Sequence, residues 1–287
     1  MSENLSPAAQ ERLDELLSIP IEQAALSCLN EEVVASLPSN PTAKQIVNEL
    51  VKNFGRGSDC YLFSEFSTKS DYEISQMAKN EMSEGFYLDE HNYLLQTPFD
   101  WLGPNEASRS HRYKIHAWYM LDSSLKYVSK SGNRDTFSYC KKIAIEWTEK
   151  FVFGSERDEF AWYDMSTAQR STLLAYIIRW SLIQESQRNS ISRFLKSMNP
   201  VEILTLIVSA DVHIHELLSE DRLALHSNHG LFQMSGLLSL CSELPFLKQS
   251  TESRSMAIRN IEEMTENHFF EDGFHKEHSP LYHVYMA

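Results

Sequence analysis

Two clusters of polar and titratable side chains bracket a pair of apolar segments in the last quarter of the chain. The first is the run 226–230, which reads His-Ser-Asn-His-Gly, and the second extends from Asp272 to His283. Polar groups at the ends of apolar helices cost stability unless they face water or a ligand. We therefore expect a functional site here, which gathers six of the eleven histidines: His226, His229, His268, His275, His278 and His283.

The spacing of these histidines does not predict a metal centre. His226 with His229, and His275 with His278, are three residues apart, but neither pair has the cysteines or paired carboxylates that complete a metal site. The chain contains only nine glycines, which disfavours glycine-rich phosphate loops. We predict neither a metal nor a cofactor.

Composition excludes several other classes of protein. The 287 residues carry a net charge of −14 and have a pI near 5.2, which argues against nucleic acid and anionic membranes as partners. The four cysteines lie far apart without a CxxC pair, as in a reducing compartment. No signal peptide and no membrane-spanning run is visible. A cytoplasmic location is the resulting expectation.

Helical periodicity dominates from residue 111 onward. Segments 201–218 and 230–243 are apolar nearly all round and the others on one face, as inner and outer helices of a ring would be. We therefore predict an all-α fold, an incomplete (α/α) toroid built from antiparallel helix pairs; an irregular helical bundle is the alternative. No strand alternation is evident. The predicted helices are 111–128, 134–152, 166–184, 201–218, 230–243 and 251–269.

Two regions are expected from this pattern. Residues 1–110 read as N-terminal helices and irregular loops packed on the scaffold, with helix starts at Ser6-Pro7 and Asn40-Pro41. Residues 111–287 read as the toroid segment that carries the site.

Three groups of residues resemble the heparinase II/III-like polysaccharide lyases, which include alginate and heparin lyases. Asn228-His229-Gly230 opens an apolar helix, as the family's Asn-His-Gly does, and segment 272–283 is similar to its "DG…E.SP.YH" motif. Upstream, the family's "W…M.TA.R" helix start and the stretch before it are matched by Trp162, Met165, Thr167, Ala168, Arg170, Trp101 and the segment Arg112 to His116. The resemblance covers about residues 95 to 287.

The resemblance implies β-elimination on an acidic polysaccharide or oligosaccharide that contains uronate. Asn228 and His229 would neutralise the uronate carboxylate, helped by the dipole of the helix start. Tyr282 would act as general acid and base. Substrate-binding roles are implied for Arg170, His283, Glu277 and Trp162, with a bidentate ion pair for the arginine. The family's β-sandwich domain would follow, and its absence from these 287 residues leads us to expect a chain without full activity.

Each of these residues also has a plain structural interpretation. Asn228 would cap the helix that follows it. Tyr282 and Trp162 would be core aromatic residues, Arg170 a charge at a helix start, and Glu277 a solvated loop residue. Two alternative functions stay open: an α/α-toroid glycoside hydrolase, which needs two facing carboxylates, and a helical module that binds glycans without catalysis.

Overall fold

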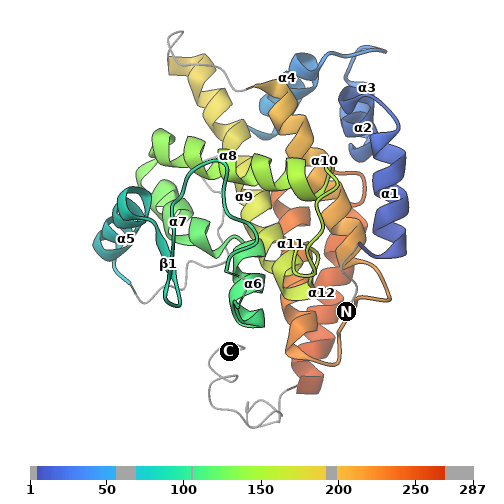
Figure 1. The fold of residues 1–287 in the computed structure, drawn as a ribbon. Coiled ribbons are helices and arrows are strands. Elements are labelled where there is room, and N and C mark those ends of the chain that lie inside the picture. Colours follow the sequence, from blue (N-terminus) through green and yellow to red (C-terminus); the bar gives the residue numbers. More distant parts are fainter. Residues whose placement is uncertain (1–4, 56–68, 105, 192–198, 269–287) are drawn as a thin grey trace.

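A computed structural model of the chain describes residues 5–55, 69–104, 106–191 and 199–268 (Figure 1). Within these ranges the fold is all-α apart from one short hairpin, so the predicted fold class is confirmed. The elements are α1 (Pro7–Leu17), α2 (Ile21–Cys28), α3 (Glu31–Ala35), α4 (Ala43–Phe54), α5 (Asp71–Glu84), β1 (Phe86–Leu88), β2 (His91–Tyr93), α6 (Arg109–His116), the 3-10 helix η1 (Tyr119–Leu121), α7 (Asp122–Ser131), α8 (Arg134–Phe151), α9 (Asp164–Ile191), α10 (Pro200–Leu217), α11 (Asn228–Glu243) and α12 (Ser250–His268).

Capping residues fix where several of these helices begin. Ser6 accepts a hydrogen bond from the backbone N–H of Ala9. Proline suits the first position of α1, because an N–H at that position would have no partner within the helix. Asn199 caps α10 in the same way before Pro200. These two starts were predicted from the sequence because the cap and the proline are both local signals.

The helices α9 and α10 run in opposite directions. Arg170 near the start of α9 donates to Nε2 of His213 near the end of α10 at 2.9 Å. Helix α8 crosses α10 instead of running along it (Figure 1). At this crossing Lys141 pairs with Glu202 at 2.7 Å, and the Trp147 ring lies 5.8 Å from that of His213.

The helices α9 and α11 are parallel and cross very closely. Gly236 of α11 lies against Ala168 of α9, where a Cβ would collide with the alanine carbonyl oxygen. Further along, Thr172 donates to Ser239 at 3.3 Å. The missing side chain at position 236 lets the backbones approach, and the common direction brings the starts of both helices to one end of the molecule.

The helix α12 returns antiparallel along α11. Asn260 contacts the sulfur of Met234, and Arg254 contacts Ser242, so the residue numbers rise on one helix as they fall on the other. The end of α12 therefore lies beside the start of α11. This is consistent with the predicted antiparallel helix pairs.

The helix α10 forms the centre of the core. It packs against α8, α9 and α11 on one side and against α1, α2 and α4 on the other, and it is buried all round as predicted. The same prediction is wrong for 230–243, because Phe232 and Leu238 of α11 are only partly buried. Figure 1 shows α1–α4 on one side of the central helices and α5, α7 and the hairpin on the other.

Two local predictions between residues 85 and 128 are wrong. The helix predicted over 111–128 is interrupted at Trp118, which has a left-handed backbone (φ 61°) and separates α6 from η1 and α7. Strands were not predicted, but β1 and β2 pair antiparallel across Asp89. The hairpin is attached to α6, because His111 contacts both Asp89 at 2.8 Å and the hydroxyl of Tyr93.

Candidate functional site

The starts of α9 and α11 meet through an Asp–His pair. Nδ1 of His229 lies 2.8 Å from Oδ2 of Asp164, and the other carboxylate oxygen, Oδ1, accepts from the backbone N–H of Met165 at 2.6 Å. The ring of Tyr163 stands edge-on to the imidazole with centroids 6.2 Å apart. Asp164 occupies the first turn of α9, where the helix dipole interacts favourably with a negative charge.

Asn228 lies beside this pair in the first turn of α11. The cap position of that helix is Ser227, whose side chain makes no capping hydrogen bond. The structural interpretation of Asn228 as the helix cap is therefore wrong: α11 begins at Asn228 and not at Gly230. Asn228 and His229 are both partly exposed.

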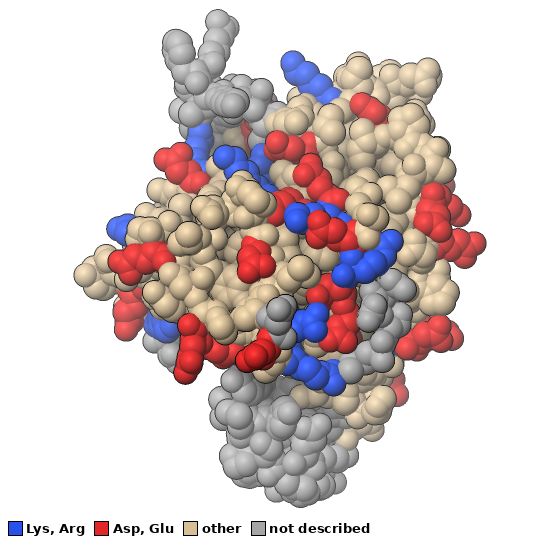
Figure 2. All heavy atoms as spheres, in the orientation of Figure 1, with Lys and Arg blue, Asp and Glu red and all other residues tan. Residues whose placement is uncertain are grey.

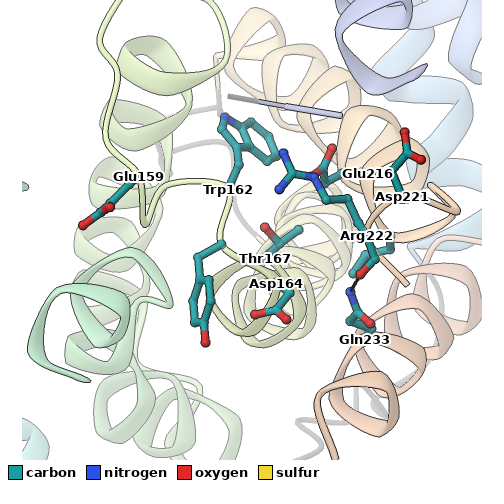
Figure 3. A pocket seen from close by; sticks show the side chains of 10 residues that line it. Glu159, Trp162, Asp164, Thr167, Glu216, Asp221, Arg222 and Gln233 are labelled. Atoms are coloured by element: carbon teal, nitrogen blue, oxygen red, sulfur yellow. Dashed lines mark hydrogen bonds and ion pairs between the residues drawn. The ribbon is translucent and has the colours of Figure 1, made fainter. Parts of the chain in front are cut away.

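A polar pocket of about 190 Å³ opens next to His229 (Figure 3). Tyr163 and Asp164, which both contact His229, are among its lining residues. Four segments meet there: the loop before α9, the start of α9, the end of α10 with the loop that follows, and α11. The lining residues are Glu159, Trp162, Tyr163, Asp164, Thr167, Glu216, Leu217, Asp221, Arg222 and Gln233.

The loop 218–227 is held against α11 by a buried glutamine. Gln233, 1% exposed, donates to the carbonyl of Arg222 at 2.7 Å and accepts from the N–H of Ala224 at 3.0 Å. Gly230 permits the close contact, because a Cβ there would lie 2.5 Å from the Ala224 carbonyl oxygen. The glycine of the Asn-His-Gly motif therefore has a packing role that fixes how its two neighbours are presented.

A buried carboxylate closes the pocket on the α10 side. Glu216 accepts from the backbone N–H of Ser6 at 2.7 Å and lies 3.4 Å from Nε of Arg222. Burial raises the pKa of Glu216, and the contacts with Ser6 and Arg222 oppose that rise. The hydroxyl of Thr167, 1% exposed, is a further polar atom in this wall.

The loop before α9 is anchored to α6 by an arginine. Arg112 donates to Asp158 at 2.7 Å and to Glu159 at 2.9 Å. Burial alone would raise the pKa of Asp158, but His116, the backbone N–H of Phe160 and Arg112 outweigh it and lower that pKa. This anchor positions the loop that supplies Glu159 and Trp162 to the pocket.

Arg170 is a core residue, which corrects the predicted substrate contact. Its exposure is 0%; its guanidinium lies 3.7 Å from the ring centroid of Trp147 and donates to the carbonyl of His116 at 2.7 Å and to His213. Burial and the nearby Arg170 cation hold the pKa of His213 well below its ordinary value, so the imidazole is neutral and accepts. No surface of Arg170 is left for a glycan carboxylate.

Trp162 does line the pocket, as its predicted role in substrate binding requires, but most of its ring is covered. The ring packs 4.9 Å from His213 and 5.5 Å from Trp147, and 4% of the residue is exposed. Tyr282, His283 and Glu277 lie outside the described residues. Their predicted roles therefore stay predictions.

Sequence reasoning missed the residues that surround His229. Asp164 stands 65 positions away from its partner, and Glu216, Arg222 and Gln233 belong to segments that were interpreted only as scaffold. One local signal was available: an acidic residue immediately before a predicted helix is typical of a first turn. No local signal in the sequence shows that Asp164 pairs with His229, which belongs to a different helix.

Charges of both signs surround the pocket. Its lining includes the carboxylates of Glu159, Asp164, Glu216 and Asp221 and the arginine Arg222, whose guanidinium points toward Glu216 and Trp162 in Figure 3. On the face shown in Figure 2, Lys and Arg side chains are likewise interspersed with Asp and Glu. Among the described residues no group of three or more His, Cys, Asp or Glu is arranged to hold a metal, and no helix there is long and apolar enough to cross a membrane.

The fold and this site define a class: an all-α module of stacked helix pairs with a polar pocket where two parallel helices begin. Residues 145–287 match the family model described as the heparinase II/III N-terminus. The chain carries a heparinase II/III-like N-terminal helical module.

Solved structures of lyases share the fold. Heparan sulfate lyase HepC from Pedobacter heparinus superposes with a TM-score of 0.67 at 17% identity, over 93% of this chain and 42% of that one. A structure titled heparinase III gives 0.63 at 14% identity, over 99% of this chain and 41% of that one. The chain thus spans about two fifths of the length of these structures. No curated protein matches it by sequence.

Proposed function

We propose that this chain is the helical module of a polysaccharide lyase that cleaves a uronate-containing acidic glycan by β-elimination. The base removes the proton α to the uronate carboxylate, the bond to the 4-linked oxygen breaks, and a carbon–carbon double bond forms. The departing oxygen takes a proton from the acid. The developing enolate needs hydrogen-bond donors at the carboxylate, which is the role proposed for Asn228 and His229. Tyr282 is proposed as the acid and base.

The observation that carries this proposal is the placement of Asn228 and His229. They occupy the first turn of α11 and are partly exposed beside a polar pocket, and neither is used as a helix cap. An amide and an imidazole at a helix start suit an anionic group that gains charge during reaction. The match of residues 145–287 to the heparinase II/III model supports the same chemistry.

The antiparallel return of α12 supports the proposed role of Tyr282. The last turn of α12 lies beside the start of α11, so the described part of the chain ends at residue 268 on the side where Asn228 and His229 lie. We propose further that the helix pairs form part of an open α/α toroid and that a β-sandwich domain completes the enzyme. His283 and Glu277 are proposed to support substrate binding from that segment.

A glycoside hydrolase is the second candidate, favoured by the carboxylates that line the pocket. Hydrolysis needs one carboxyl kept protonated near a second carboxylate. The raised pKa of Glu216 suits the first requirement. Its contacts with Ser6 and Arg222, and the engagement of Asp164 by His229, leave these two groups poorly disposed toward a glycosidic bond.

Product chemistry separates the candidates. The full-length protein, incubated with alginate, heparan sulfate and polygalacturonate, is expected to release unsaturated uronate ends that absorb in the ultraviolet. Reducing ends without that absorbance would support the hydrolase, and binding without either product would support a non-catalytic module.

The role of Asn228 has its own test. In an active full-length protein, Asn228→Ala is expected to lower kcat by about two to three orders of magnitude, because a donor to the enolate is lost. Asn53→Ala on the surface of α4 is the matched control. Full activity of Asn228→Ala would contradict the assigned role.

A further inference from the structure

We propose that Asp164 is a positioning residue that holds the His229 imidazole with its proton on Nδ1, so that Nε2 is the ring nitrogen presented to a substrate. The inference concerns a residue outside the recognised motifs. Its catalytic meaning rests on the lyase function proposed above, but the geometry that carries it does not.

The contacts of Asp164 leave it one way to interact with the imidazole. An ionised carboxylate only accepts hydrogen bonds. Oδ2 lies 2.8 Å from Nδ1 of His229, so the shared proton belongs to Nδ1. Oδ1 is already occupied by the N–H of Met165 at 2.6 Å, which stops the carboxylate from rotating away. Both oxygens of the Asp164 carboxylate thus accept hydrogen bonds, and the one from His229 joins the start of α9 to the start of α11.

The backbone reinforces this orientation. Asp164 lies in the first turn of α9, where the helix dipole favours a negative charge. The close crossing of Gly236 and Ala168 and the parallel course of the two helices hold the starts of α9 and α11 at a fixed separation. The edge of the Tyr163 ring limits the imidazole on a further side.

The tautomer determines what His229 offers to a glycan. With the proton on Nδ1, a neutral imidazole presents a lone pair at Nε2. It donates a hydrogen bond from Nε2 to a uronate carboxylate only after it gains a second proton, and the Asp164 carboxylate stabilises that cation. The donor role proposed for His229 therefore requires the imidazolium, which carries protons on both ring nitrogens.

The structure also predicts how the tautomer reverses. In Asp164→Asn, the amide oxygen is retained by the N–H of Met165, so the amide nitrogen takes the place that faces His229. An amide nitrogen only donates, and Nδ1 must then become the acceptor. The proton moves to Nε2, as happens when the aspartate of a Ser-His-Asp triad is replaced by asparagine. Asp164→Ala removes the hydrogen bond that holds the proton on Nδ1.

The test is nitrogen-15 NMR of the imidazole in the 287-residue chain, with His229→Gln used to assign the signal. The wild-type protein is expected to show a protonated Nδ1 and an unprotonated Nε2 in the neutral form, and Asp164→Asn the reverse. Asp221→Asn, which removes another carboxylate of the same pocket, is expected to leave the tautomer unchanged. A wild-type His229 with its proton on Nε2 would overturn the proposal without any variant being needed.

Activity and tautomer are read independently. If the full-length protein proves not to be a lyase, the NMR result still decides whether Asp164 sets the tautomer. If it is a lyase, Asp164→Asn is expected to lower kcat by about two to four orders of magnitude while KM changes little, because the His229 imidazolium loses its carboxylate partner. Asp135→Asn, at an exposed first-turn position of α8 outside the pocket, is the control. Reversal of the tautomer with kcat unchanged would show that the orientation of His229 is irrelevant to turnover and would refute its catalytic meaning.

Discussion

Single residues in this protein divide into those that face the pocket and those that only hold it together. Arg170 belongs to the second kind, although its position in a motif predicted a substrate contact. Its cation lies against the face of Trp147 and donates to His116 and His213 through Nη1 and Nε, an arrangement that depends on the planar guanidinium. Asp164 belongs to the first kind, and its partner His229 keeps 35% of its side chain accessible.

Arg170→Lys tests that division. Lysine cannot reproduce the stacking or the two directed hydrogen bonds, so the free energy of unfolding is expected to fall by about 2–3 kcal/mol in urea denaturation. The exposed Arg259→Lys on α12 is the control and is expected to change stability by less than about 0.5 kcal/mol. Unchanged stability together with an increased KM for glycan would restore the substrate-binding role.

The contact between helices α5 and α7 depends on one carboxyl group. Glu81 of α5 accepts from Ser123 at 3.2 Å, while its other oxygen is buried, and burial raises the Glu81 pKa to about 7 from the ordinary 4.5. The protonated form is thus favoured in the folded state. Its contribution to stability is complete below about pH 4.5 and is lost as the pH rises through about 7.

Glu81→Gln removes that titration. We expect the variant to be more stable than the wild type by about 1–2 kcal/mol near pH 8, with the difference vanishing near pH 4, as measured by urea denaturation at each pH. Glu84→Gln, at an exposed position of the same helix, is the control. An effect of Glu81→Gln that is the same at both pH values would show that the carboxyl does not titrate in this range.

The crossing of α9 and α11 is set by a glycine. In Gly236→Ala the added methyl group meets the Ala168 backbone and not a movable side chain, so the helices must separate. The free energy of unfolding is expected to fall by about 1–3 kcal/mol, and the NMR signal of a protonated Nδ1 on His229 should weaken. Ser235→Ala on the same helix adds no volume and should leave both unchanged. If Gly236→Ala preserves both, the crossing does not position the Asp–His pair.

Elements with local signals were predictable and those without were not. Cap and proline together located the starts of α1 and α10. The break at Trp118 has no glycine or proline to mark it, and strands of three residues are too short for alternation to be seen. The all-α fold class therefore followed from helical periodicity. The break at Trp118 and the hairpin could not be predicted in that way.

For the molecule as a whole, the site depends on contacts that no short stretch encodes. Asn228 and His229 were identified from a motif, but Asp164 reaches His229 only because α10 intervenes and returns the chain. The two-region division at residue 110 stays a prediction. The described structure adds that the N-cap of α1 supports the pocket wall, since the backbone N–H of Ser6 donates to Glu216.

The parallel course of α9 and α11 has a further consequence for a protein of net charge −14. At that end the N–H of Met165 in α9 is occupied by Asp164, so the attractive potential for an anion comes from the peptide groups in the first turn of α11, which holds Asn228 and His229. Reagents that modify lysine or arginine leave that potential in place, and it does not titrate. A protein of net negative charge can in this way offer one end to an anionic polymer.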